Sequence, residues 1–585
     1  ITNVGLVTVQ FSEPVTGIDI TDFALSRDAG SGPFGVPLTG VVVTPLSASQ
    51  YTLNLGNVTG IDGTYLLTLV ALGSQIEDMI PNGLVGDASD SWTRGEASDA
   101  SGDLDITDAT GTLEIIGSGG TVIDGNGIDR IFQVQESISL ILRNLTLTGG
   151  SVTGSANGGG VHNSGSLVLS GVTVSGNESE ASGGGLFNTL GGALTVDESD
   201  VSSNSAFDGG GLYNNDNGTV SILNSSVDNN TAENDGAGIY NDLDATIDVI
   251  NSDIDGNNAV GQGGGIYNND AAIVNVTNSR LSLNTAEDGG AIFNELASVL
   301  NITNSTFATN QAGDDGGAIY NDDGLVTSIR SIFSGNVAAD GGGVLFNASN
   351  GDVSHTDDTM ALNSAGGRGG VADNFGSLAI FTATLTDNSA TDGGAIASSG
   401  QLDGSGSDIV NNHASSRGGA VFGDEDGAIT ITTSTLSGNA SDGDGGGVFA
   451  TDNGDVTISF STVTGNRAEG DGGGVFNATN PSLLISESLL TANHAEGDGG
   501  GIYNNEFGIA TVLNTTLGDN TATNGAAIAN AGQFALTHST VFGNEAEVAG
   551  GGVFNAPTIP DTLDMRNTIV AGNTAAAGND LSGSR

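Results

Sequence analysis

Apolar residues in this chain come in short runs separated by glycine, asparagine and other turn residues. Between residues 264 and 289 the phrases GGIYNND, AAIVNVTNS and RLSLNTAEDG follow one another, and each alternates apolar with polar positions. This alternation predicts β-strands and lacks the 3.6-residue period of an amphipathic helix. Three short strands and three turns fill the segment, which predicts one coil of a β-solenoid.

The predicted coil belongs to a long repeat array. A phrase of two or three glycines, an aliphatic residue, an aromatic residue and Asn recurs from residue 158 onward at steps of 24 to 27 residues. A second marker, Asn-x-Ala or a near variant, recurs at the same step from Asn177 to Asn573. The two markers predict a parallel β-helix of three-stranded coils, with about 26 residues per turn and about 18 turns.

Asparagine at a buried turn can bond its own backbone and the asparagine stacked on it in the next coil. We therefore expect a structural ladder along the first marker. Its members include Asn188, Asn214, Asn241, Asn268, Asn294 and Asn321.

Pairing of GGAI or GGGV with phrases such as FSGN at 333–336 resembles the repeats of polymorphic outer-membrane autotransporter passengers and related bacterial secreted β-helix proteins. The resemblance covers about residues 103–585 and implies a right-handed solenoid. It also implies an extracellular or bacterial cell-surface protein that acts as an adhesin, a stalk or a self-assembling fibre subunit.

The first 94 residues lack the repeat and instead show alternating runs such as QYTLNLG and GTYLLTLVAL between turns. This pattern predicts an all-β sandwich and resembles bacterial Ig-like domains. Either the chain is trimmed at Ile1, or an open strand edge there accepts a strand from a neighbouring subunit, which would build a head-to-tail homopolymer. The predicted division is an Ig-like domain at 1–94, a linker at 95–102, a cap with the first coils at 103–150, and β-helix repeats at 151–585.

Composition narrows the possible partners. The 585 residues include 69 Asp and Glu against eleven basic residues, all of them Arg, which gives a net charge of -58, and there is no Cys. A chain this acidic has no basic surface for nucleic acid or anionic lipid, and no apolar run is long enough for membrane insertion. Cations, glycans, a cell-surface ligand or a second copy of the chain remain as partners.

The residue before each glycine phrase is often Asp, and three successive coils carry DGDGG, EGDGG and EGDGG. Stacked carboxylates repel one another, and Ca²⁺ would relieve the repulsion because it prefers oxygen ligands. The alternatives are weak Ca²⁺ sites, with Ca²⁺ as the one expected cofactor, and a merely hydrated acidic edge. The residues concerned are Asp442, Asp444, Glu469, Asp471, Glu496 and Asp498.

An aromatic residue precedes most Asn of the first marker, and strand alternation places it on the face opposite the core. Such rings could stack on sugars or on a second solenoid, or the protein's own loops could cover them. The predicted binding stripe consists of Tyr213, Tyr240, Tyr267, Phe293 and Tyr320.

Catalytic patterns are weak. The five His occupy unrelated repeat positions, and no Ser-His-Asp or HExxH arrangement appears. We therefore expect no enzyme. The alternative is a polysaccharide-binding or polysaccharide-degrading β-helix with a cleft beside Arg368 and Arg417, the two arginines that interleave with Asp340 and Asp392.

Overall fold

The computed structural model describes residues 6–11, 14–28, 33–59, 63–70, 76–78, 88–94, 104–106, 112–424, 427–451, 454–478, 482–556 and 563–583. The predicted edge at Ile1 and the predicted linker at 95–102 lie outside these ranges. Apart from one short 3-10 turn, η1 (Ile20–Asp22), the described elements are β-strands. No helix in the described ranges is both long and apolar enough to cross a bilayer.

The chain divides into two compact units. The first consists of residues 1–260, 265–267 and 271–274, and the second of residues 261–264, 268–270 and 275–585. The predicted domain boundaries at residues 94, 102 and 150 follow the sequence pattern and stay predictions.

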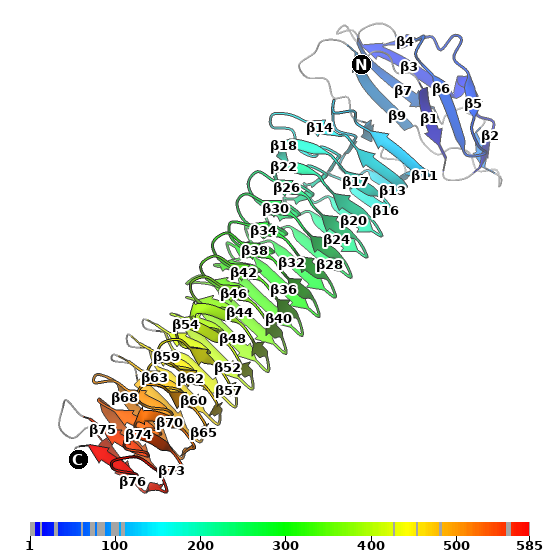
Figure 1. The fold of residues 1–585 in the computed structure, drawn as a ribbon. Coiled ribbons are helices and arrows are strands. Elements are labelled where there is room, and N and C mark those ends of the chain that lie inside the picture. The colour runs from blue at the N-terminus through cyan, green and yellow to red at the C-terminus, as the bar shows by residue number, and fades with distance from the viewer. Residues whose placement is uncertain are drawn as a thin grey trace. The chain divides into compact units, whose positions relative to one another are not determined.

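Small antiparallel sheets form the N-terminal part (Figure 1). Their shared core includes Leu25, Leu53 and Tyr65, none more than 3% exposed. Antiparallel strands therefore occur in the region predicted to be a sandwich, whereas its Ig-like identity stays a prediction. In sheet order the strands are β1 (Leu6–Gln10), β6 (Gln50–Asn54) and β5 (Val43–Pro45); β4 (Pro33–Val36), β3 (Phe23–Asp28), β7 (Gly63–Leu69) and β9 (Ala88–Arg94); and β2 (Val15–Thr16) with β8 (Glu77–Asp78).

A long parallel β-solenoid of about 17 turns follows, so the predicted all-β class and parallel coils are confirmed. Each typical coil supplies one strand to sheet 1, two to sheet 2 and one to sheet 3. Sheet 1 has 19 strands from β10 (Leu104–Ile106) to β78 (Leu581–Gly583), sheet 2 has 34 from β11 (Thr112–Asp124) to β77 (Ile569–Ala571), and sheet 3 has 16 from β14 (Ser151–Val152) to β74 (Glu545–Ala549).

One coil of each unit illustrates the pattern. Inward residues such as Val220 and Ile222 are at most 2% exposed and alternate with more exposed outward residues such as Thr219 and Ser221, as the period of two requires. The coil of the first unit contains β23 (Leu212–Asn214), β24 (Thr219–Leu223), β25 (Ser226–Asp228) and β26 (Thr231–Ala232). The coil of the second contains β39 (Ile319–Asp322), β40 (Leu325–Ile329), β41 (Ile332–Ser334) and β42 (Val337–Ala338).

The glycine phrase forms the corner before each sheet 1 strand. Gly209 has φ +63°, a left-handed conformation that side chains disfavour. A Cβ on the next residue, Gly210, would collide with the carbonyl of Thr231 in the following coil. Gly209 is therefore required by its backbone conformation, and Gly210 by the close approach of the neighbouring coil.

Candidate functional site

Two asparagine ladders hold the coils in register. Nδ2 of Asn188 donates to Oδ1 of Asn214 at 2.8 Å, and Nδ2 of Asn294 donates to Oδ1 of Asn321 at 2.8 Å. In the second ladder Asn204 bonds Asn230 in the same way at 3.1 Å. The ladder members named here are at most 1% exposed. Their amides serve the fold and are not accessible to a ligand.

A third ladder, of serines, was missed by the sequence analysis. The N–H of Ser199 donates to Oγ of Ser225 at 3.0 Å, and Oγ of Ser225 donates to the carbonyl of Leu223 at 2.7 Å. These serines form the bend between the two sheet 2 strands of a coil. A signal was available, because Ser recurs five positions before the second Asn marker in most coils.

The aromatic column consists of the residue before the first-marker Asn, which is the second residue of most sheet 1 strands. Rings in successive coils stack, with centroids 4.6 Å apart between Tyr213 and Tyr240 and between Phe293 and Tyr320. Tyr267 and Phe293 are buried, and the other three members of the predicted binding stripe are half-buried. This burial favours the alternative in which the protein covers the column, so sugar stacking at the Tyr213, Tyr240 and Tyr320 edges stays a prediction.

The acidic residues before the glycine phrases lie beside this column. Burial is the main cause that raises the pKa of Asp315 to about 6, and the nearby carboxylates of Asp314, Asp288 and Asp340 raise it further. Burial likewise raises the pKa of Tyr320, next to Asp288, and brings that of Tyr503 to about 12. The acidic edge is therefore partly desolvated.

The six predicted Ca²⁺ ligands lie in three kinds of surroundings. Asp444, Asp471 and Asp498 accept from backbone groups of the next coil. The N–H of Asp471 donates to Oδ1 of Asp444 at 2.8 Å, that of Asp498 to Oδ1 of Asp471 at 2.6 Å, and that of Asn524 to Oδ1 of Asp498 at 3.1 Å. The two Glu members share Arg467, which forms ion pairs with Glu469 at 3.2 Å and with Glu496. Asp442 lies 3.6 Å from His413. Arg467 thus already supplies part of the charge that Ca²⁺ was expected to supply.

Carboxylates suited to a cation converge elsewhere on the same edge. One oxygen from each of Asp288, Asp314 and Asp315 lies within 4.8 Å of the other two. Asp288 and Asp315 are half-buried, Asp314 is exposed, and the pKa of Asp288 is raised mainly by burial. These three carboxylates are therefore a compact set of oxygen ligands of the kind expected for Ca²⁺. The spacing of acidic residues in the sequence did not single them out.

The aromatic column has a gap, and the side chain of Arg368 fills it. The column position is Asp373 in one coil and Ala397 in the next, so two rings are missing. The guanidinium of Arg368 lies in the gap, 5.1 Å from the ring of Phe375 and 5.6 Å from that of Phe422. Its Nε is 3.2 Å from Oδ1 of Asp373. Arg368 thus stands in for a missing ring.

The same cluster holds a strongly perturbed acid. Asp373 is 3% exposed, and burial raises its pKa to about 7 although Arg368 opposes the rise. Arg368 also donates to Oγ of Ser399 at 2.8 Å and lies 3.6 Å from Asp424. Arg417 forms a two-pronged ion pair with Asp392 at 3.1 and 2.8 Å. Both arginines are thus engaged by carboxylates of the solenoid itself.

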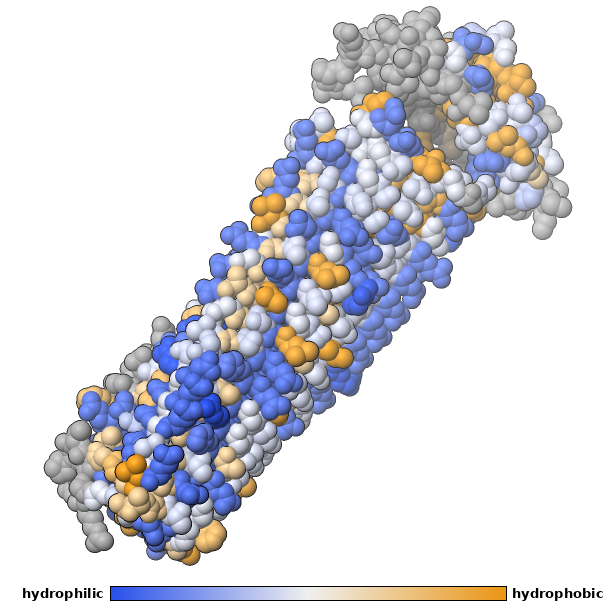
Figure 2. Space-filling model, viewed as in Figure 1, coloured by the Kyte–Doolittle hydropathy of each residue, from blue (hydrophilic) through white to orange (hydrophobic). Residues whose placement is uncertain are grey.

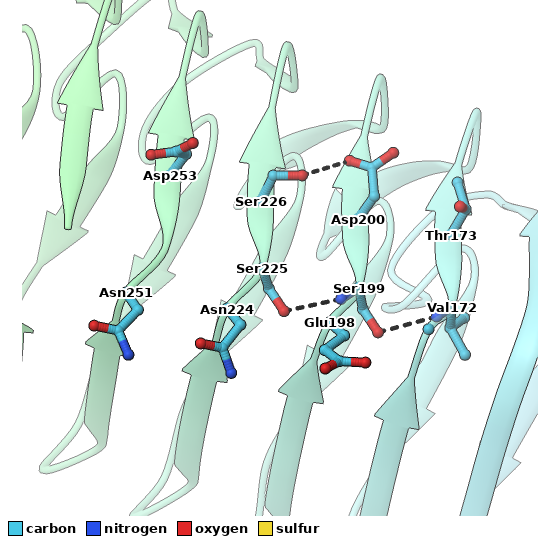
Figure 3. Close-up of a pocket in the computed structure, with 11 residues that line it drawn as sticks. Val172, Thr173, Glu198, Ser199, Asp200, Asn224, Ser225, Ser226, Asn251 and Asp253 are labelled. Atoms are coloured by element: carbon cyan, nitrogen blue, oxygen red, sulfur yellow. Dashed lines mark hydrogen bonds between the residues drawn. The ribbon is translucent and has the colours of Figure 1, made fainter. Parts of the chain in front are cut away.

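A shallow groove of about 450 Å³ follows the sheet 2 bend in the first unit (Figure 3). Its floor is the serine ladder. One wall carries the residues just before the bend, and the other carries the first outward residues of the following strands. Figure 3 shows Glu198, Asn224 and Asn251 in one row and Thr173, Asp200, Ser226 and Asp253 in the other.

Comparison with known protein families gives a match within the solenoid. The repeat of the Chlamydia polymorphic membrane protein matches residues 304–322. The matched segment contains FATN at 307–310 and GGAI at 316–319. Phe307, Asn310 and Ile319 are fully buried, so the similarity rests on residues that build the coil. No curated protein and no solved structure matches the chain.

Proposed function

We propose that this chain is an extracellular or bacterial cell-surface β-solenoid with an adhesin-like role. The similarity of residues 304–322 to a polymorphic membrane protein repeat carries the proposal, because its two phrases recur in the same columns of the other coils. The finer roles of stalk and self-assembling fibre subunit belong to the same proposal, as does head-to-tail contact between copies.

The physical character of the molecule supports display outside the cell. Continuous hydrogen-bond ladders stabilise a fold that has no disulfide, and the face seen in Figure 2 is mostly hydrophilic with scattered hydrophobic residues. A net charge of -58 favours solubility at high local density.

Adhesion is tested with beads that carry the full chain. We expect them to bind epithelial cells several-fold better than beads coated with an unrelated protein of similar negative charge. Equal binding would contradict the adhesin role. Negative-stain images of the same protein test the fibre role, since filaments support it and isolated particles contradict it.

We also propose that carboxylates of the acidic edge bind Ca²⁺ weakly, at Asp288, Asp314 and Asp315 and at the six residues predicted from the sequence. Added CaCl₂ should raise the Tm more than MgCl₂ at equal ionic strength, because binding to the folded chain alone stabilises it. The excess of the CaCl₂ shift over the MgCl₂ shift should become smaller in Asp314→Asn, which alters the first group of carboxylates. It should also become smaller in Asp471→Asn, which alters the six residues predicted from the sequence. Equal shifts with both salts would show charge screening only.

A second candidate function is polysaccharide binding, which the polar groove of Figure 3 favours. Polysaccharide degradation is its catalytic form. Degradation predicts that Arg368→Ala and Arg417→Ala abolish any activity on polysaccharides, whereas a structural role predicts a change in stability alone.

A further inference from the structure

The groove is built by backbone conformation and does not depend on a flexible loop. Glu198, Asn224 and Asn251 have φ values of +48°, +49° and +50°, so each turns its chain sharply at the bend. The residues before and after the bend then form two rows, one on either side of the serine ladder (Figure 3). Because the coils are in register, the walls repeat at the strand spacing of about 4.8 Å.

The floor has no free backbone for a peptide to pair with. The N–H of Val172 donates to Oγ of Ser199 at 3.0 Å, and Oγ of Ser199 donates to the carbonyl of Asp197 at 2.7 Å. The flanking strands are already paired on both sides within sheet 2. A ligand must therefore be recognised by side chains of the walls, and strand addition is not available to it.

The walls combine acceptors with donors. Asp200 is held in place, because its Oδ1 accepts from Oγ of Ser226 and its Oδ2 from Oγ of Ser202, both at 2.9 Å. Asn224 and Asn251 carry amides that both donate and accept, and Thr173 adds a hydroxyl. Nδ2 of Asn224 donates to Oδ1 of Asp197 at 3.3 Å, which leaves its second N–H and its Oδ1 for a ligand. No lining residue is basic, so an anionic polymer would be repelled.

We infer that the groove between Gly171 and Asp253 binds a neutral, linear polysaccharide lying across successive coils. Hydroxyl groups of such a chain donate to Glu198, Asp200 and Asp253 and accept from the two asparagine amides. A repeating row of polar groups suits a repeating polymer better than one compact ligand. This inference rests on the second function proposed above and adds the place and the class of ligand.

Asn also occupies this bend position at Asn278 and Asn304, and the row of amides then ends. The position of Asn224 in the bend is taken in later coils by Arg330 and by Phe460, both also at positive φ. A long side chain there replaces the short amide, and Arg330 already donates to Oδ1 of Asn304 at 3.0 Å. Binding is therefore not expected at the coils of Arg330 and Phe460.

The test uses the full chain in affinity electrophoresis through gels that contain dextran, β-glucan or mannan, with a cationic chitosan gel as the test for unspecific charge attraction. The double variant Asn224→Gly/Asn251→Gly removes both amides, and glycine accepts the positive φ, so the bend is retained. We expect binding to weaken about fivefold or more, as the loss of one or two hydrogen bonds would give. The matched control Asn514→Gly, at the same bend position but many coils farther along the chain, should bind like the unchanged chain.

Three results would overturn the inference. If the unchanged chain is retarded and the double variant is retarded equally, polysaccharide binding stands but the groove is not the site. If no neutral polysaccharide retards the unchanged chain, both the groove and the second candidate function fail, while the bead assay still tests adhesion separately. If only cationic chitosan retards it and about 0.5 M NaCl abolishes the effect, the association is electrostatic and unspecific. Circular dichroism confirms that each variant is folded.

Discussion

At the scale of single residues, the coil imposes backbone conformations that the local sequence would not choose. Leu283 and Leu362 have φ values of +58° and +61° and are 62% and 67% exposed. The same turn position holds Gly335 and Gly438 in other coils. A left-handed conformation costs an ordinary residue about 1–2 kcal/mol. Pairing with the coils on both sides therefore outweighs this cost.

Replacing Leu362 with Asn should stabilise the protein by about 0.5–1 kcal/mol, because Asn tolerates positive φ and leucine gains little from burial there. Chemical denaturation measures the difference. As a control, Leu325→Asn makes the same exchange at an exposed strand position and should give no gain. A gain at both positions would show that removal of exposed leucine, rather than relief of backbone strain, is responsible.

At the scale of elements, the ladders bind each coil to its neighbours through buried polar groups. Nδ2 of Asn310 donates to Oδ1 of Asn336 at 2.9 Å and to the carbonyl of Leu281 at 3.0 Å. Its Oδ1 accepts from the N–H and the Nδ2 of Asn284 at 3.1 and 3.0 Å. One side chain thus satisfies groups in the coils on both sides.

Asn310→Ala should destabilise the adjoining coils by about 2–4 kcal/mol, because several buried donors and acceptors lose their partners at once. Hydrogen exchange should show faster opening in the segments around residues 284 and 336. Exposed Asn278 offers the control, since Asn278→Gly removes an amide without emptying the ladder. Similar exchange in the two variants would mean that the ladder adds little to stability.

The aromatic column also connects neighbouring coils, through stacked rings. Arg368 spans the gap left by Asp373 and Ala397 and is itself only 25% exposed, so it combines an ion pair with ring contacts. A planar guanidinium stacks on rings in a way that an ammonium group does not.

Arg368→Ala should cost about 2–3 kcal/mol, because Asp373 would remain buried without its counter-charge. Arg368→Lys should recover little of that loss. The double variant Arg368→Met/Asp373→Phe should recover most of it, since a ring then joins the column. Thermal unfolding measures the Tm of each variant. Arg467→Ala, which removes a half-exposed arginine, serves as the control. Equal losses for Arg368→Ala and Arg467→Ala would rule out a special role for the gap.

At the scale of the whole molecule, partly buried acids set the response to pH. The pKa values of Asp228, Asp315 and Asp471 are raised to about 6, and that of Asp373 to about 7, above the ordinary value of 3.8. The folded chain therefore holds more protons than the unfolded chain between pH 3.8 and about 7. Stability is greatest at the acid end of this window and is lost as the pH rises through it.

The Tm should be higher at about pH 5 than at about pH 8, the reverse of the usual acid sensitivity. Asp373→Asn should raise the Tm at pH 8 and have little effect at pH 5, where the carboxyl is already protonated. Added NaCl should stabilise the chain at pH 8, because it screens the net charge of -58. A Tm that rises with pH would contradict this assignment of the raised pKa values.

Much of the solenoid was predictable because each coil repeats the same short sequence pattern. The glycine corner, the inward aliphatic residues and the Asn markers recur at one period, and stacking equivalent residues is the only arrangement that buries all of them. The 24- to 27-residue step therefore determined the parallel coils and their approximate number. The acidic edge and the aromatic positions were also readable as columns, because a column depends on the step alone.

The side chains that contact each column could be identified only from the tertiary structure. Three features depend on contacts between residues at different repeat positions: the burial of Phe293, the guanidinium of Arg368 in the ring gap, and the convergence of Asp288, Asp314 and Asp315. The groove at Asn224 depends on a left-handed bend that its own sequence does not mark uniquely. Sequence determined what repeats, because stacking acts between equivalent positions. Structure decided which side chains meet across different positions, because that depends on distances no period encodes.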